Sequence, residues 1–115
     1  EDAALAVGAH DHGQPVGAFA DAVVFSFAPF KPLGGAGTGA IIATSNIAIA
    51  ERLRLLTGYG GSADQVTGAA GHQHYLADGY HVPLDPLQAA LLLVKLPYLA
   101  EWTARRRAVA RAYAD

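Results

Sequence analysis

The feature that most limits what this chain can fold into is a stiff, glycine-rich connection between two apolar runs. Residues 22–28 and 39–44 contain many β-branched or aromatic side chains, so both are predicted to be strands, the first of them buried. In the connection, Lys31 lies between two prolines, which restrict the backbone there. A surface lysine gains nothing from a restricted backbone, whereas a lysine that presents its amine to a bound carbonyl is held in place by it. Lys31 is therefore the candidate catalytic residue, with a solvated loop lysine as the alternative.

The composition indicates one modest domain with more apolar surface than it can bury alone. Of its 115 residues, 52% are hydrophobic and 16% are charged. The formal net charge of −2 creates no field that would attract nucleic acid, and the lack of cysteine excludes disulfides and thiolate metal sites. No segment reads as a signal sequence or a membrane span. We expect no nucleic-acid partner, no membrane partner and a cytoplasmic location.

Both ends of the sequence read as interrupted elements. Residues 1–4 look like the end of a strand already under way, and residues 108–115 lie inside a helical pattern with no stop signal. We therefore expect an internal fragment of a longer protein, whose apolar excess serves contacts with missing parts or with another subunit.

Two helices are predicted on either side of a long loop. Ser45 and Asn46 are both N-cap candidates for a helix that ends near residue 57. Residues 60–83 are rich in glycine and histidine with little periodicity, and are predicted to be a long functional loop.

The second predicted helix begins at Asp85, because an N-cap aspartate followed by proline is a strong start signal. Residues 84–96 are apolar almost all round, so this helix is expected to be buried. Pro97 should break or kink it, and a further helix follows whose arginines are expected to face solvent.

The glycine-rich run at residues 34–39 formally fits a dinucleotide-binding pattern, which requires a helix directly after it. The chain instead continues as a strand, so that interpretation is rejected. The glycines are expected to let the backbone pass close to Lys31 or to a ligand.

Two His-x-His pairs raise the question of metal binding: His10 with His12, and His72 with His74. Both pairs lie in turn-like segments without a pattern of acidic partners, so we predict no metal site. A small metal-binding domain is kept as the weakest alternative.

The remaining constellation is an acid, a hydroxyl and an amine. Asp2 ends one strand, Ser26 lies on the next, and Lys31 follows five residues later. Pyridoxal 5'-phosphate (PLP) chemistry uses this set: a lysine binds the aldehyde, an aspartate keeps the pyridine nitrogen protonated, and hydroxyls hold the phosphate.

These residues resemble the DegT/StrS family of PLP-dependent aminotransferases, which act on nucleotide-linked ketosugars. The matching positions run in order through the whole chain: residues 1–4, 16–17, 21–22, 25–27, Lys31, 33–34, Gly37, 53–54, Gly60, 79–80, 84–90, 95–96, Leu99, Trp102 and 105–107.

The resemblance implies an α/β fold, part of the aspartate-aminotransferase-type large domain (PLP fold type I), with a mixed sheet flanked by helices. Residues 1–96 would belong to this PLP-binding domain, and residues 97–115 would start the helix leading to a missing carboxyl-terminal small domain. The implied activity is transamination of a nucleotide-linked ketosugar to an aminosugar, with an amino-acid donor that we expect to be glutamate. A homodimer with a shared active site is implied as well.

Four residues match functional positions of the family. Lys31 matches the lysine that binds PLP and moves a proton during the reaction. Asp2 matches the partner of the pyridine nitrogen, and Ser26 matches the serine at the cofactor phosphate. His81 stands where an asparagine usually reaches the partner subunit's phosphate site, and an imidazole can donate the same hydrogen bond.

Other positions depart from the family pattern. Leu5 replaces a glutamine or histidine that lies against the cofactor, and leucine cannot hydrogen-bond. Pro32, Thr38 and Pro83 replace residues that are common in the family. These departures motivate an alternative, a non-catalytic regulatory or binding member of the same fold, although Lys31 argues against the sugar-dehydratase branch, which carries histidine there. The sugar, the nucleotide and the aminated carbon stay open.

Overall fold

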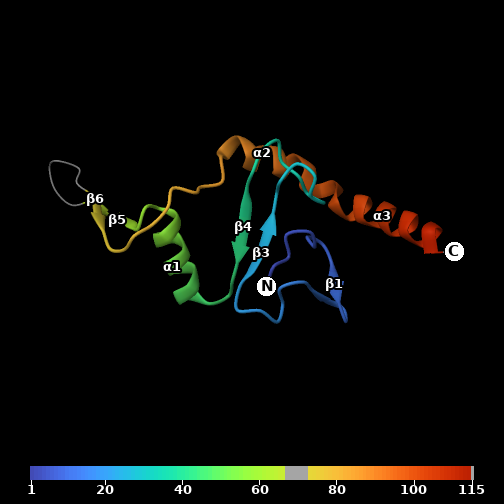
Figure 1. Ribbon diagram of the computed structural model, residues 1–115, viewed down its shortest axis with the longest axis horizontal. Coiled ribbons are helices and arrows are strands. Elements are labelled where there is room, and N and C mark those ends of the chain that lie inside the picture. The colour runs from blue at the N-terminus through green and yellow to red at the C-terminus, as the bar shows by residue number, and fades with distance from the viewer. Residues whose placement is uncertain (67–72, 115) are drawn as a thin grey trace. The chain divides into compact units, whose positions relative to one another are not determined.

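The structure is a computed structural model that describes residues 1–66 and 73–114. It forms two compact units, residues 1–43 with 84–115, and residues 44–83. The elements in chain order (Figure 1) are β1 (His10–Asp11), β2 (Gln14–Pro15), β3 (Val23–Ser26), β4 (Ala40–Ala43), α1 (Ile47–Thr57), β5 (Gly61–Val66), β6 (Gln73–Tyr75), α2 (Pro86–Lys95), the 3₁₀ helix η1 (Leu96–Tyr98) and α3 (Leu99–Ala114).

The first unit is built on a small mixed sheet. β3 and β4 pair antiparallel, with Ser26 opposite Ala40, so both predicted strands are confirmed. The amino-terminal segment adds a parallel bridge, in which Asp2 pairs with Val24. In that bridge the Ala3 N–H donates to the Val24 carbonyl at 2.9 Å. Asp2 therefore lies beside β3.

The two faces of this sheet differ in what covers them. Because side chains alternate along a strand and bridge partners share a face, Asp2, Val24 and Ser26 project from one face. Phe25 lies on the opposite face and packs against the hydrophobic core. That core is a cluster of three buried side chains with four half-buried neighbours: Phe27, Leu33 and Leu92, then Val7, Phe25, Leu84 and Leu99.

Helix α2 begins as predicted, because the Asp85 carboxylate accepts the Leu87 N–H at 2.8 Å and Pro86 occupies the first turn. The prediction that the helix is buried was wrong. Of its residues, all of which the structure describes, Leu92 alone is buried, and Leu93 is 68% exposed. Only one side of α2 has the sheet and its connecting loop to pack on (Figure 1), so the other side has no neighbour within its unit.

The chain continues past α2 through Pro97 without a wide turn. Pro97 lies in η1, and the 3₁₀ turn leads directly into α3. The predicted kink is therefore confirmed. Among the residues that the structure describes, no helix is long and apolar enough to cross a bilayer.

In the second unit, α1 starts at its predicted cap. The Asn46 side chain accepts the N–H groups of Ala48 and Ile49 at 3.0 and 3.3 Å, so Asn46 rather than Ser45 is the N-cap. Gly58 ends the helix.

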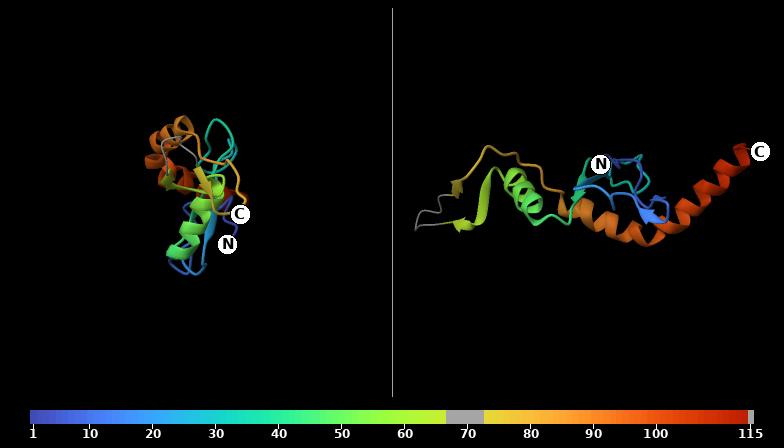
Figure 2. Two further views of the ribbon diagram at one scale, coloured as in Figure 1. Left: turned by 90° about the vertical axis from the view of Figure 1, so that its left-hand side faces the viewer. Right: turned by 90° about the horizontal axis from the view of Figure 1, so that it is seen from below.

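The long loop predicted over residues 60–83 was partly wrong. Residues 61–66 and 73–75 form the antiparallel pair β5 and β6 (Figure 2), whereas residues 67–72 lie outside the described part of the chain. Backbone hydrogen bonds hold such a ribbon together, so its side chains need not show the hydrophobic alternation on which the prediction relied.

Candidate functional site

Lys31 lies on a tight turn directly after β3. Its N–H donates to the Ala28 carbonyl at 2.9 Å, and the flanking prolines restrict the same turn. The Lys31 side chain is half-buried, and its Nζ lies 5.2 Å from the ring centre of Phe30, a side chain that is 81% exposed. The hydrogen bond and the prolines thus restrict the backbone at Lys31, and its side chain stays partly exposed.

The connection that carries Lys31 is closed at its base by Phe27. The Phe27 N–H donates to the Gly39 carbonyl, and the Phe27 carbonyl accepts the Gly35 N–H, both at 2.8 Å. We call residues 28–38 the lysine loop. Both ends of this loop are therefore fixed to the end of β3.

Side chains from α2 and α3 hold the lysine loop from outside. Gln88 Oε1 accepts the N–H groups of Ala36 and Gly37 at 2.8 and 3.1 Å. Lys95 Nζ donates to the Gly34 carbonyl. From α3, the Arg106 guanidinium donates to the Pro32 carbonyl at 3.4 Å.

The glycines of this loop permit these close approaches. A Cβ placed on Gly35 would lie 2.6 Å from Gln88 Oε1, and one on Gly39 would lie 2.6 Å from Leu84 Cδ1. The sequence predicted that the glycines let the backbone pass close to Lys31 or a ligand. Gly34 does lie against the backbone of the Lys31 turn, whereas Gly35 and Gly37 lie against Gln88 of α2 and Gly39 lies against Leu84. Tight packing of helix on loop explains them.

Asp2 and Ser26 lie on the same face of the sheet, on neighbouring segments. One carboxylate oxygen of Asp2 accepts the Ala4 N–H at 3.0 Å, and the side chain is exposed. The Ser26 hydroxyl accepts the Ala28 N–H at 3.4 Å, directly before the turn of Lys31. The fold therefore places a carboxylate and a hydroxyl on one face of the sheet, and an amine on the turn that follows β3.

This donor set fits PLP. A carboxylate with a free oxygen can pair with a protonated pyridine nitrogen, a hydroxyl can donate to a phosphate, and a primary amine can bind the aldehyde. All three groups belong to the first unit, and the loop that carries the amine is held by its own hydrogen bonds.

His81 belongs to the second unit, where it stacks on Tyr59. The two ring centres are 4.7 Å apart with an interplanar angle of 18°, and Gly58 forms an isolated backbone bridge with His81. Tyr59 has a φ of +61°, a left-handed conformation that side chains other than glycine rarely adopt. Both residues are exposed, so the stacked pair lies at the surface of the unit.

The structure describes the side chains of one of the two His-x-His pairs, His10 with His12. His12 contacts Asp11 at 2.9 Å in the turn between β1 and β2. Within residues 1–66 and 73–114, no group of three or more metal-ligating side chains comes together. His72 and the side chain of His74 lie outside the described residues.

Sequence reasoning missed Gln88 and Lys95 as parts of the site. The available signal was their isolation, because they are the two polar residues in the otherwise apolar α2. A helix with only two polar residues is predicted to lie in the hydrophobic core. That prediction concealed the contact of both polar side chains with the glycine-rich backbone.

The sequence matches the DegT/DnrJ/EryC1/StrS aminotransferase family over residues 1–115. The chain belongs to this family. It is 45% identical over 113 residues to the erythromycin biosynthesis sensory transduction protein EryC1 of Saccharopolyspora erythraea, covering 98% of this chain and 29% of that protein. It is 39% identical over 115 residues to the dTDP-3-amino-3,4,6-trideoxy-alpha-D-glucose transaminase of Streptomyces venezuelae, covering 98% and 28%. The chain thus spans less than a third of the length of these relatives.

Solved structures of this family agree with the fold. The chain superposes on S. venezuelae DesV, crystallised with a ketimine intermediate, with a TM-score of 0.84 at 37% identity, covering 96% of this chain and 28% of that one. For a DegT DnrJ EryC1 StrS aminotransferase from Brucella abortus, the TM-score is 0.86 at 34% identity, with coverages of 98% and 28%. The predicted family and the predicted α/β aminotransferase fold are therefore confirmed.

Proposed function

We propose that this protein transfers an amino group to a nucleotide-linked ketosugar, using PLP and an amino-acid donor. The observations that support the proposal are the backbone turn that carries Lys31 and the shared sheet face of Asp2 and Ser26. Family membership supports it, as do relatives named as dTDP-sugar transaminases. Glutamate as donor, a homodimer with a shared active site and a cytoplasmic location stay predictions.

Each candidate residue has a defined task in this proposal. Lys31 Nζ would hold the cofactor aldehyde covalently until the amine of the incoming substrate replaces it there, and the freed lysine amine would then take the proton from the substrate carbon that bears nitrogen. Asp2 keeps the pyridine nitrogen protonated, and Ser26 donates to the phosphate. His81 donates to the phosphate bound by the other subunit of the dimer. When bound, PLP supplies a ring that accepts the electron pair left on the substrate carbon.

The same proposal assigns the chain to domains of the longer protein. Residues 1–96 form part of the cofactor-binding large domain, and residues 97–115 begin the helix that leads to a small domain.

Borohydride reduction of the full-length protein with PLP, followed by peptide mapping, tests the proposal. A reduced pyridoxyl group is expected on Lys31. Lys95 is the other lysine of this chain and serves as an internal control, because its amine already donates to the Gly34 carbonyl. Lys31→Ala should abolish the label while leaving the fold nearly intact. An unlabelled Lys31 in a folded protein would refute the assignment.

The alternative is a regulatory or binding protein that keeps the fold without turnover. Two relatives carry regulatory names: the sensory transduction protein EryC1, and a pleiotropic regulatory protein from Geobacillus stearothermophilus that is 40% identical over 113 residues. Leu5 supports it too, since leucine offers no hydrogen bond where the family has a polar residue. Labelling of Lys31 without amine transfer from glutamate to any dTDP- or UDP-linked ketosugar would favour this alternative.

A further inference from the structure

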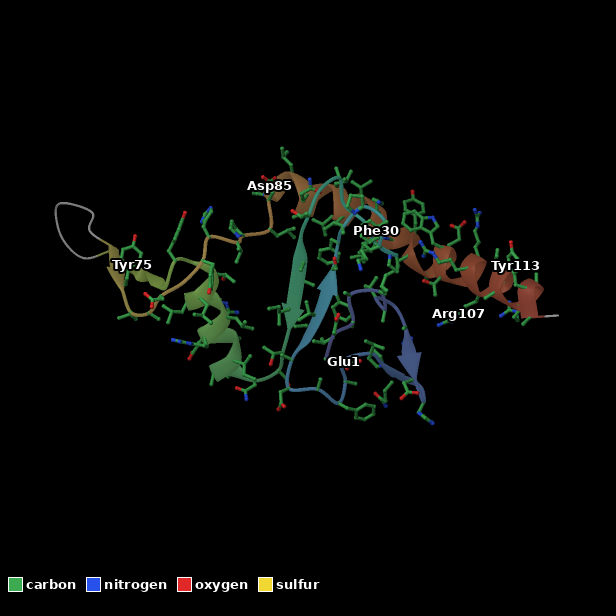
Figure 3. The ribbon with its side chains drawn as sticks, in the orientation of Figure 1. Glu1, Phe30, Tyr75, Asp85, Arg107 and Tyr113 are labelled. Carbon is green, nitrogen blue, oxygen red and sulfur yellow. The ribbon has the colours of Figure 1, made fainter. Side chains whose placement is uncertain are left out.

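Three residues of α2 form one stripe against the lysine loop. Gln88, Leu92 and Lys95 are spaced i, i+4 and i+7, which places them on one face of the helix. Gln88 accepts two loop N–H groups, Leu92 packs in the cluster that contains Leu33, and Lys95 donates to the Gly34 carbonyl. Figure 3 shows side chains of α2 beside the loop at Phe30. The stripe thus contacts the loop from residue 33 to residue 37.

Gln88 makes the contact that the loop can least replace. Its Oε1 accepts two successive backbone N–H groups, those of Ala36 and Gly37. Successive N–H groups that point to one side form a concave site that attracts anions. Here the neutral carboxamide oxygen of Gln88 occupies that site. This gives a structural reason why residues 34–39 do not form a phosphate-binding loop.

Lys95 holds the same part of the lysine loop as a hydrogen-bond donor, whereas Gln88 holds it as an acceptor. It donates to a carbonyl, and its Nζ also lies 5.9 Å from the ring centre of Trp102. The segment is therefore fixed by an acceptor at Ala36 and Gly37 and by a donor at Gly34. Neither side chain lies on the loop itself.

We propose that Gln88 is a positioning residue for Lys31, acting through the lysine loop rather than by touching the cofactor. This inference rests on the proposed function. Gln88 limits the lysine loop to one conformation, so that the Lys31 amine meets the cofactor in one orientation. Without the Gln88 acceptor, the Ala36 and Gly37 N–H groups turn to water and the loop samples other conformations.

The test compares Gln88→Leu with Gln88→Glu in the full-length protein. Glutamate keeps an acceptor at the same length, whereas leucine removes it. Gln14→Leu, on the exposed strand β2, is the matched control. Two readouts apply: amide hydrogen exchange over residues 33–39 without cofactor, and the visible circular dichroism of the lysine-bound cofactor, which reports its orientation.

Gln88→Leu is expected to speed exchange at Ala36 and Gly37 about tenfold, since one hydrogen bond is worth roughly that factor. It should also lose most of the visible circular dichroism while Lys31 is still labelled. Gln88→Glu and Gln14→Leu should match the wild-type protein in both readouts.

Wild-type exchange and dichroism in Gln88→Leu would overturn the inference. If Gln88→Leu does not fold, Gln88→Glu decides, because fast exchange in this acceptor-retaining variant would equally overturn it. A wild-type protein that takes no pyridoxyl label on Lys31 would instead refute the proposed function, while the exchange measurement still reports whether Gln88 holds the loop.

Discussion

Replacing Gly34 with alanine tests whether the lysine loop has any room for a side chain at that position. A Cβ on Gly34 would lie 2.8 Å from the Pro29 carbonyl carbon, closer still to its oxygen, and 2.9 Å from the Ala28 oxygen. These are backbone atoms of the turn that carries Lys31, so the methyl group fits only if the turn moves. Overpacking costs about 1–3 kcal/mol. We expect the upper part of that range, because no flexible side chain can give way.

This cost in free energy should appear as faster hydrogen exchange of the Phe27 and Gly35 amides, whose hydrogen bonds close the loop. A cost of about 3 kcal/mol corresponds to roughly 100-fold faster exchange. Gly37→Ala is the control: its Cβ would lie 3.2 Å from the Gln88 Nε2, so that side chain has to shift by only a few tenths of an ångström and can keep its hydrogen bonds. This control should stay within about threefold of wild type. Equal exchange rates in the two variants would refute the steric argument.

Two further predictions concern the helices and the isolated piece. Asp85→Ala removes the N-cap of α2 and should lower the free energy of unfolding by about 1 kcal/mol in denaturant titrations. Asp85→Asn keeps a capping oxygen and should leave the free energy of unfolding unchanged. An equal loss in both variants would contradict a capping role. The isolated 115-residue chain should be poorly soluble or partly folded, because α2 exposes Leu87, Leu93 and Val94. A sharp cooperative melt of a monomeric sample would contradict that expectation.

The elements with strong local signals were predictable from sequence. Asn46 and Asp85 each accept backbone N–H groups at the start of a helix, and such caps depend only on a few neighbouring residues. The strands on either side of Lys31 followed from their β-branched content. The place of Asp2 beside β3 was not predicted, since nothing in residues 1–4 alone specifies a parallel partner.

The features that sequence reasoning missed depend on contacts between distant segments. Gln88 meets Ala36 across 52 positions, and no local pattern records which backbone groups a helix will face. The exposure of Leu93 was missed because composition tells how apolar a helix is and not how many layers surround it. The β5 and β6 pair was missed because ladder hydrogen bonds are independent of side-chain identity.

Closure of the lysine loop by Phe27 also determines when the chain loses conformational entropy. Fixing the backbone of one residue costs about 1–2 kcal/mol. A loop that became ordered only when ligand arrived would subtract that amount, residue by residue, from the binding free energy. Because the Phe27 N–H and carbonyl both form backbone hydrogen bonds that close the loop, these bonds order it during folding. The entropy of ordering this loop is then not subtracted from the binding energy of a ligand.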